Sequence, residues 1–183
     1  MPAQFRIRVA TAEDVPVLRE LIDLSVRGLQ SSDYTAKQID SALRTVFGVD
    51  SQLISDGTHL VAEAVVNESP VIVGCGGWSM RKTLYGGDGY KDRQDDFLDP
   101  RHDAAKIRSF FIHPDWARHG VGSMILDACE AAARAAGFTR FEMAATLTGV
   151  KLFRKRGYVA LEQIDLPLEN GLFLRVVRMS KQA

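Results

Sequence analysis

A short turn, HPDWARHGVGS, joins two segments of different periodicity between residues 113 and 123. The segment before it, KIRSFFI, is rich in aromatic and β-branched residues and is typical of a strand. After it, apolar residues recur at helical spacing, at Val121, Ile125, Cys129, Ala132 and Ala136. The opposite stripe is polar, with Ser123, Asp127, Glu130 and Arg134, and Gly137 follows. The sequence therefore predicts a strand, a glycine-containing turn and an amphipathic helix in direct succession.

The two glycines of this turn, Gly120 and Gly122, lie where the strand gives way to the helix. The first turn of a helix carries unpaired backbone N–H groups and the positive end of the helix dipole, which together suit a phosphate. Arg118 and His119 add positive charge beside the same amides. The glycines could equally serve only to let the helix pack against its strand, and for this pair alone both interpretations stay open.

Two common nucleotide-binding motifs do not fit this turn. A dinucleotide-binding fingerprint needs a third glycine three residues after the second, and that position is Ile125. A P-loop needs Lys and then Ser or Thr after the glycine, whereas Gly122 is followed by Ser123 and Met124.

The rest of the chain predicts further strands and helices. FRIRV at residues 5–9 alternates as a strand, Thr11 and Asp14 form a capping pair for a helix, and a second helix follows over 35–47. HLVAEAVV and VIVGCGGW are predicted strands joined by the turn NESP.

After the amphipathic helix, FTRFEMA is a predicted strand, and Thr148 is the predicted cap of a short helix that ends at Gly157. YVALEQI and LFLRVVRM are predicted to form a hairpin through Asn170 and Gly171. The expected order is β-α-α-β-β-β-α-β-α-β-β in a single domain over residues 1–183.

The segment from Met80 to Asp103 has glycines, many charges and no sustained periodicity. A run of this length inside a domain is either a functional flap or disordered, and both interpretations stay open.

Composition excludes several classes of partner. Lysine plus arginine equals aspartate plus glutamate at 23 each, so no basic field favours nucleic acid. Cys75 and Cys129 lie in apolar stretches and are expected to be reduced core thiols, and the four histidines are scattered, so no metal site is expected. The first residues lack the apolar core of a signal peptide, and no run is long enough to span a membrane. We expect a cytoplasmic protein with no membrane partner, and a homodimer is left open.

The order of elements, with IHPDWARHGVGS before the amphipathic helix and GVKLFRKRGY after it, resembles the GNAT acyltransferase superfamily over nearly the whole chain. The resemblance implies an α/β fold of the α+β type, with a central, mixed, mostly antiparallel sheet of about seven strands and about four flanking helices. It also implies an N-acetyltransferase that uses acetyl-coenzyme A as co-substrate and a small-molecule or peptide amine as acceptor.

The resemblance also implies a binding site for the co-substrate. In the family, a Gln/Arg-x-x-Gly-x-Gly/Ala loop binds the pyrophosphate through backbone amides, and the preceding strand pairs with the pantetheine arm. Carried over to this chain, the binding residues are Phe110, Phe111, Ile112, Arg118, His119, Gly120, Val121, Gly122, Ser123 and Phe153.

The chain departs from the family pattern at three places. Ala117 stands where the family usually has Gln or Arg, although Arg118 follows at once. Phe153 stands where a tyrosine commonly acts as general acid for the leaving thiolate. Lys106 and Arg108 lie in the strand where the family often places a glutamate base, and cationic side chains do not serve as bases at neutral pH.

These departures slow the expected reaction without forbidding it. A thiol titrates near pH ~8.5 and a lysine-like amine near ~10.4, so at neutral pH the amine is further from its reactive form. Loss of the acid therefore matters less than loss of the base, and orientation alone supplies much of the rate. The catalytic residues remain unknown from the sequence.

Several other side chains are weaker candidates, and for each an ordinary structural or solvated role is the favoured interpretation. Potential bases on segments near the acyl end are Glu63, His102 and Asp103. Tyr34 and Trp78 could line an acceptor pocket. The basic run could contact the 3′-phosphate of coenzyme A through Lys151, Arg154, Lys155 or Arg156. An acyl-coenzyme A sensor without turnover is the competing function, which Phe153 and the absence of an acidic residue before the loop favour.

Overall fold

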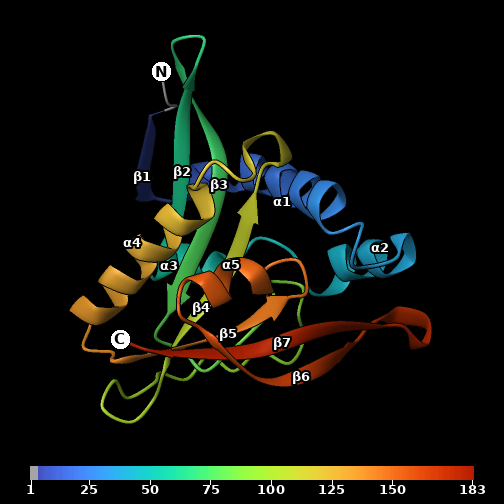
Figure 1. The fold of residues 1–183 in the computed structure, drawn as a ribbon, viewed down its shortest axis with the longest axis vertical. Coiled ribbons are helices and arrows are strands. Elements are labelled where there is room, and N and C mark those ends of the chain that lie inside the picture. Colours follow the sequence, from blue (N-terminus) through green and yellow to red (C-terminus); the bar gives the residue numbers. More distant parts are fainter. Residues whose placement is uncertain (1–3) are drawn as a thin grey trace.

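The computed structural model of the chain describes residues 4–183 and contains a seven-stranded sheet of order β1-β2-β3-β4-β5-β7-β6 (Figure 1). The strands are β1 (Phe5–Val9), β2 (His59–Val66), β3 (Ser69–Ser79), β4 (Ala105–Ile112), β5 (Arg140–Thr146), β6 (Val159–Pro167) and β7 (Phe173–Gln182). The α-helices in this part of the chain are α1 (Val15–Leu29), α2 (Ala36–Thr45), α3 (Ser51–Ser55), α4 (Val121–Ala135) and α5 (Val150–Lys155). The mixed, mostly antiparallel sheet and its element order confirm the expected fold class.

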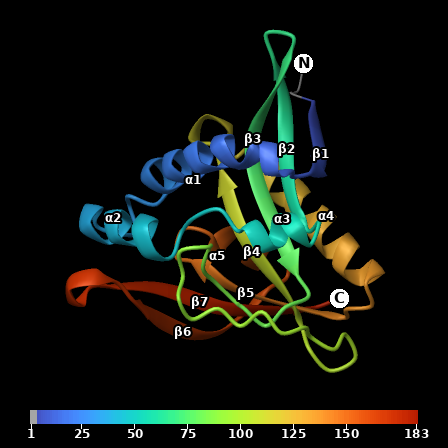
Figure 2. The same ribbon diagram turned by 180° about the vertical axis from the view of Figure 1, so that it is seen from behind.

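The helices cover both faces of the sheet. Helices α4 and α5 lie on the face seen in Figure 1, and α1, α2 and α3 lie on the face seen from behind in Figure 2. Each face has its own apolar core. On the α4 face, the core is centred on Ile125, Phe141 and Met143. On the α1 face, it includes Leu18 and Leu174.

Strands β4 and β5 are the only parallel pair among the described strands, and they pair over a very short stretch. Their register comprises Ala105 with Phe141 and Lys106 with Glu142. Beyond these pairs β4 bends, because its pairing with β3 shifts register and Ser109 has a φ of 59°. The two strands therefore diverge towards the start of α4, in the middle of the sheet.

Helix α3 was not predicted, because five residues are too few to show a periodicity. Asp50 caps it by accepting the backbone N–H of Leu53 at 3.2 Å. The carboxylate of Asp50 is also fully buried, and it has partners elsewhere in the fold that are described below.

The predicted extent of α4 was correct to within one residue, because Ala136 is its C-cap, but two side chains were assigned to the wrong face. Glu130 was assigned to the polar stripe but is buried, with its carboxylate accepting from Tyr158, Lys181 and Arg134 at 2.8–3.0 Å. Ala136, assigned to the apolar stripe, is exposed. The C-terminal strand covers the Glu130 side of the helix, and this contact leaves no mark on the helical periodicity.

Two turn predictions had different outcomes. Thr148 does not cap α5, whose N-cap is Gly149, and its hydroxyl instead donates to Asp33 at 2.6 Å. The β6–β7 hairpin forms as predicted, with Asn170 and Gly171 in the left-handed region at φ values of 57° and 72°. Within residues 4–183, no helix has the length and apolar character needed to cross a membrane.

Candidate functional site

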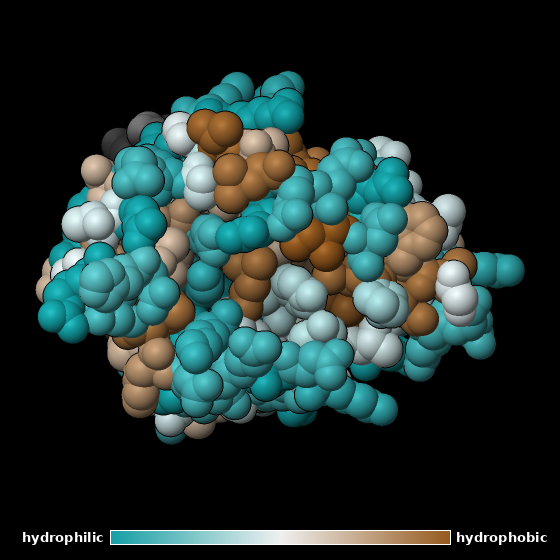
Figure 3. Space-filling view, turned by 90° about the horizontal axis from the view of Figure 1, so that it is seen from below, coloured by the Kyte–Doolittle hydropathy of each residue, from teal (hydrophilic) through white to brown (hydrophobic). Residues whose placement is uncertain are grey.

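The divergence of β4 and β5 opens a cleft of about 620 Å³. Residues from the first turn of α4 and from α5 line one side, and residues from α1 and from the segments after α2 and β3 line the other. The cleft therefore reaches both faces of the sheet. Seen from below, the surface is mainly hydrophilic, with apolar side chains visible between hydrophilic neighbours near its centre (Figure 3).

The backbone at the start of α4 forms an anion cradle in the cleft wall. The first helical hydrogen bond runs from the N–H of Met124 to the carbonyl of Gly120 at 3.0 Å. The N–H groups of Val121, Gly122 and Ser123 precede this bond and so have no acceptor within the helix. All three residues line the cleft. The positive end of the helix dipole is thus directed at the space between β4 and β5.

The two glycines of the cradle serve different purposes. Gly120 has a φ of 84°, and residues with a side chain adopt this conformation only under strain. At Gly122 an added Cβ would lie 3.0 Å from the Leu152 side chain, so the missing side chain lets α4 approach α5. Gly122 therefore has a packing role, although against α5 and not against the preceding strand as the sequence suggested, and the cradle conformation depends on Gly120.

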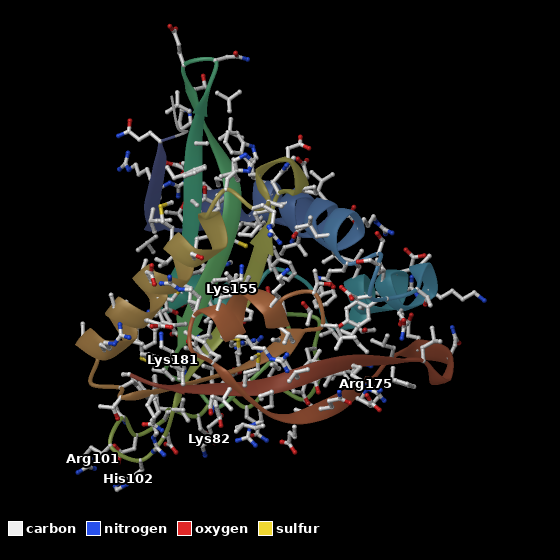
Figure 4. The ribbon with its side chains drawn as sticks, viewed as in Figure 1. Lys82, Arg101, His102, Lys155, Arg175 and Lys181 are labelled. Atoms are coloured by element: carbon white, nitrogen blue, oxygen red, sulfur yellow. The ribbon has the colours of Figure 1, made fainter. Side chains whose placement is uncertain are left out.

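Cationic side chains surround the cradle. Arg118, Lys151 and Lys155 line the cleft, and Lys155 lies on α5 close to the centre of Figure 4. His119 does not line it, because the ring turns back to place Nδ1 2.9 Å from the Ala117 carbonyl. Arg156 is paired with Asp127 on α4, outside the cleft wall.

The β4 side of the cleft contains the three predicted strand residues, Phe110, Phe111 and Ile112. The backbone N–H of Ile112 donates to the Ser25 hydroxyl of α1 at 3.0 Å. Phe153 faces these residues from α5, with its ring centroid 5.7 Å from that of Phe110. The aromatic side chain is buried and carries no proton that could assist a leaving group.

Tyr158 is the nearest tyrosine in sequence to Phe153, and it does not replace the missing hydroxyl. The two rings pack edge to face at 5.9 Å, but the Tyr158 hydroxyl donates to Glu130 at 3.0 Å. Burial raises the pKa of Tyr158 further above its ordinary value, and the Glu130 carboxylate adds to this effect. Tyr158 therefore has a structural role beneath α4.

None of the three potential bases lines the cleft, and each has the ordinary structural or solvent-exposed position that the sequence favoured. Glu63 accepts from Arg8 of the neighbouring strand at 2.7 Å. His102 is exposed at the tip of the loop before β4, far from Lys155 (Figure 4), and Asp103 accepts the backbone N–H of Asp99. Glu63 lies on β2, whereas the positions of His102 and Asp103 depend on the path of the loop before β4, which the sequence does not specify.

The two aromatic residues suggested for an acceptor pocket belong to the core instead. Tyr34 donates its hydroxyl to the Arg175 carbonyl at 2.6 Å and accepts the Leu147 N–H at 2.9 Å, and burial raises the pKa of Tyr34 to about 12. Trp78 packs against Phe138 at 6.1 Å.

The segment between Met80 and Asp103 follows a defined path and supplies part of the cleft wall. Arg81 binds Asp56 through two hydrogen bonds of 2.7 and 2.8 Å, and Thr83 and Gln94 bond to each other across the loop. This bracing places residues 84–87 on the cleft.

The sequence indicated only that Arg108 is unsuited to act as a base, and it gave no sign of the charged cluster that surrounds this side chain. Its side chain lies in the cleft wall, 3% exposed, and Nη2 is 2.7 Å from Asp50 Oδ2. Arg93 approaches the same carboxylate at 3.2 Å. Burial lowers the pKa of the Arg108 guanidinium, and Nε is buried with no hydrogen-bond partner among the described residues. Lys106, by contrast, is paired with Glu142 at 2.7 Å.

The chain shares its fold with solved structures that are named acetyltransferases. A GCN5-related N-acetyltransferase from Rhodopseudomonas palustris matches with a TM-score of 0.70 and 23% identity, covering 100% of this chain and 98% of that one. PaiA N-acetyltransferase from Thermoplasma acidophilum, in complex with coenzyme A, matches with a TM-score of 0.65 and 13% identity, covering 98% of this chain and 99% of that one. YncA from Salmonella typhimurium, a putative acetyltransferase with its cofactor acetyl-CoA, matches with a TM-score of 0.61 and 16% identity, covering 97% of this chain and 93% of that one.

The sequence itself defines the family. The model of the acetyltransferase (GNAT) family matches residues 24–158, so the chain belongs to this family. No curated protein matches the chain. Membership confirms the expected class, an N-acetyltransferase with acetyl-coenzyme A as co-substrate.

Proposed function

We propose that this chain transfers an acetyl group from acetyl-coenzyme A to the amine of a small molecule or peptide, which attacks the thioester directly. The observation that carries the proposal is the cleft between β4 and β5, which reaches both faces of the sheet and has the α4 cradle at one end. A phosphate-bearing thioester and an amine can enter such a cleft from opposite sides.

The residues of the cradle suit the charged end of the co-substrate. The N–H groups of Val121, Gly122 and Ser123 would hold the pyrophosphate, with Arg118 and Lys151 supplying positive charge. When bound, acetyl-coenzyme A supplies the activated thioester. The aromatic and aliphatic side chains of β4 would line the apolar part of its arm.

Direct attack is favoured because both cysteines are unsuited to carry an acetyl group. Cys75 and Cys129 are fully buried. Burial raises the pKa of Cys75 to about 12 and also raises that of Cys129, and the thiolate is the nucleophilic form of a thiol. Neither thiol therefore offers a nucleophile for a covalent intermediate.

The protein contributes mainly orientation to this reaction. Phe153 cannot donate a proton, and the described side chains of the cleft wall include Arg108 and Lys155 but no carboxylate or imidazole. The attacking amine has to be neutral, and we infer that its proton leaves to solvent. A free thiol titrates near pH ~8.5, so its departure near neutral pH needs little assistance.

A coenzyme A sensor is the second candidate, and the apolar Phe153 favours it. Release of free thiol from acetyl-coenzyme A, measured with a panel of amines, separates the two functions. Transfer predicts release that depends on the acceptor and saturates with it. A sensor predicts binding of acetyl-coenzyme A with no release above the uncatalysed rate for any amine in the panel.

A further inference from the structure

The wall of the cleft contains one buried cation whose hydrogen bonds are incomplete. Arg108 lies just before the bend of β4 and is buried. Its Nη2 forms an ion pair with Asp50 and donates a hydrogen bond to the Gly86 carbonyl, but Nε has no partner among residues 4–183. A buried donor without an acceptor is costly, and this cost disappears when a ligand supplies the acceptor.

The charge around this side chain is unevenly balanced. Asp50 is fully buried and lies between two guanidinium groups, at 2.7 Å from Arg108 and 3.2 Å from Arg93. Two further carboxylates act on this cluster: Asp95, which lies 3.6 Å from Arg93, and Asp88. Both side chains are exposed and so screened by water. The buried part of the cluster therefore holds two positive charges and one negative charge, a balance that favours an anion.

The remainder of this side of the cleft is largely apolar. Its apolar lining residues include Leu29, Val46, Phe47, Leu166 and Leu174, and the uncharged polar side chains near them are Ser25, Gln30 and Tyr85. Apolar walls with one charged group are typical of small-molecule sites, in which the polar group fixes the orientation of the ligand. The occupant suited to this half is an apolar body that carries one anionic group.

We propose that Arg108 is a specificity-determining residue that binds a carboxylate on the acceptor, so that the acceptor is an apolar amine bearing a carboxylate. This inference rests on the proposed function, because it concerns the amine that enters the same cleft. A small shift of the side chain would let the guanidinium donate to the carboxylate, as paired guanidinium and carboxylate groups commonly do.

The test compares acceptors that differ only in the carboxylate. Phenylalanine and leucine are measured beside phenylalaninamide and leucinamide, with kcat/KM and KM for the acceptor determined separately. The amides have less basic amines and hence more of the neutral nucleophile, so basicity alone favours them. We expect the opposite, a preference of about 10- to 100-fold in kcat/KM for the carboxylates, which corresponds to one charge-assisted hydrogen bond.

Arg108→Gln should abolish this preference by raising KM for the carboxylates while leaving the amides nearly unchanged. The single variant removes one of the two cations beside Asp50. The double variant Asp50→Asn/Arg108→Gln therefore removes the same guanidinium while keeping the net charge of the Asp50, Arg93 and Arg108 cluster unchanged. Arg175→Gln is the matched control, because Arg175 is exposed on β7 and pairs with Asp165 away from the cleft. It should keep the full preference.

Binding is measured alongside turnover, as the melting-temperature shift that each amine causes in the protein saturated with coenzyme A. Carboxylate-dependent shifts that vanish in both Arg108 variants support the proposal even if no amine is acetylated. An unchanged preference in the variants, or shifts equal for carboxylates and amides, overturns it. An equal loss of kcat for every acceptor also overturns it, because Arg108 would then act on the thioester. A protein that does not bind coenzyme A at all contradicts the proposed function instead.

Discussion

At the scale of single residues, the most informative position is Phe153. Phe153→Tyr adds one hydroxyl to a side chain that lines the cleft and packs against Phe110 and Tyr158. If departure of the thiolate limits the rate, turnover should rise. The upper bound is the general-acid range of roughly 10²–10⁴, and we expect the low end because the amine must still lose its proton.

Turnover of Phe153→Tyr has to be measured together with its melting temperature. The side chain is 6% exposed, and a buried hydroxyl without a partner would destabilise the protein by roughly 1–3 kcal/mol. A stable variant with unchanged turnover would show that thiolate departure does not limit the rate.

His59 predicts a loss of stability in acid. The imidazole is fully buried, neither nitrogen has a partner among the described residues, and burial lowers its pKa to about 4 from the ordinary 6.5. The unfolded chain therefore binds a proton below pH 6.5 that the native protein does not. The stabilisation is complete above pH 6.5 and falls by roughly 3 kcal/mol as the pH approaches 4.

The check is denaturant unfolding of wild type and His59→Gln at several pH values between 7 and 4. Because Gln does not titrate, the unfolding free energy of the variant should decline less steeply over this range. The difference in slope should correspond to the uptake of up to one proton on unfolding. Identical slopes in the two proteins would mean that His59 titrates normally in the native state.

Sequence and structure agree on residues whose role follows from their neighbours along the chain, and differ on the others. The cradle glycines and Phe153 were predicted to bind the co-substrate, and the structure places all of them in the wall of the cleft, where their binding role stays a prediction. Arg108 was missed as a binding residue because strands β2 and β3 separate it from its partner Asp50 along the chain. Glu130 was misplaced for the same reason, since Lys181 comes from the last strand.

At the scale of elements, the loop between β3 and β4 depends on the Arg81–Asp56 pair. Both side chains are mostly buried, and their two hydrogen bonds fasten the loop to the end of α3. Asp56→Asn should weaken this attachment and accelerate the first proteolytic cut within residues 80–103 several-fold. Bound substrates should slow that cut, because the loop lines the cleft.

The control for the loop is Asp165→Asn, which removes an Asp–Arg pair of similar geometry whose side chains are 44–45% exposed, on the β6–β7 hairpin. It should leave the cleavage pattern as in wild type. Cleavage of Asp56→Asn that begins elsewhere, at the wild-type rate, would mean that the pair does not hold the loop.

The elements with strong periodicity or turn residues could be predicted, and the irregular ones could not. The strands, α1, α4 and the β6–β7 hairpin follow from patterns of 2 or 3.6 residues and from the Asn170–Gly171 turn. Helix α3 is held by the Asp50 cap, and the loop before β4 is held by ion pairs. Interactions of this kind depend on the folded surroundings.

At the scale of the molecule, the central feature is the separation of β4 from β5. The family resemblance implied a mixed sheet, but the width and lining of the cleft come from the bend at Ser109 together with the brief parallel pairing. Neither property has a local signature in the sequence. The two cores, one on each face, hold the sheet on both sides of this opening.

Acetyl-coenzyme A should raise the melting temperature of the whole protein, because a ligand that binds only the native state stabilises it. Gly122→Asp should remove this rise by placing a carboxylate in the cradle. Ala131→Asp is the control, with the same charge on an exposed position of α4. A folded Gly122→Asp protein with the wild-type response would place the co-substrate elsewhere.

The most direct measurement follows the acetyl group itself. The protein is incubated with acetyl-coenzyme A carrying an isotope label in the acetyl group, with and without an acceptor amine, and both amine and protein are examined by mass spectrometry. Direct transfer predicts label on the amine nitrogen only, none on the protein, and no product with Gly122→Asp. Label on the protein in the absence of acceptor, or no labelled amine across the panel despite bound acetyl-coenzyme A, would contradict the account.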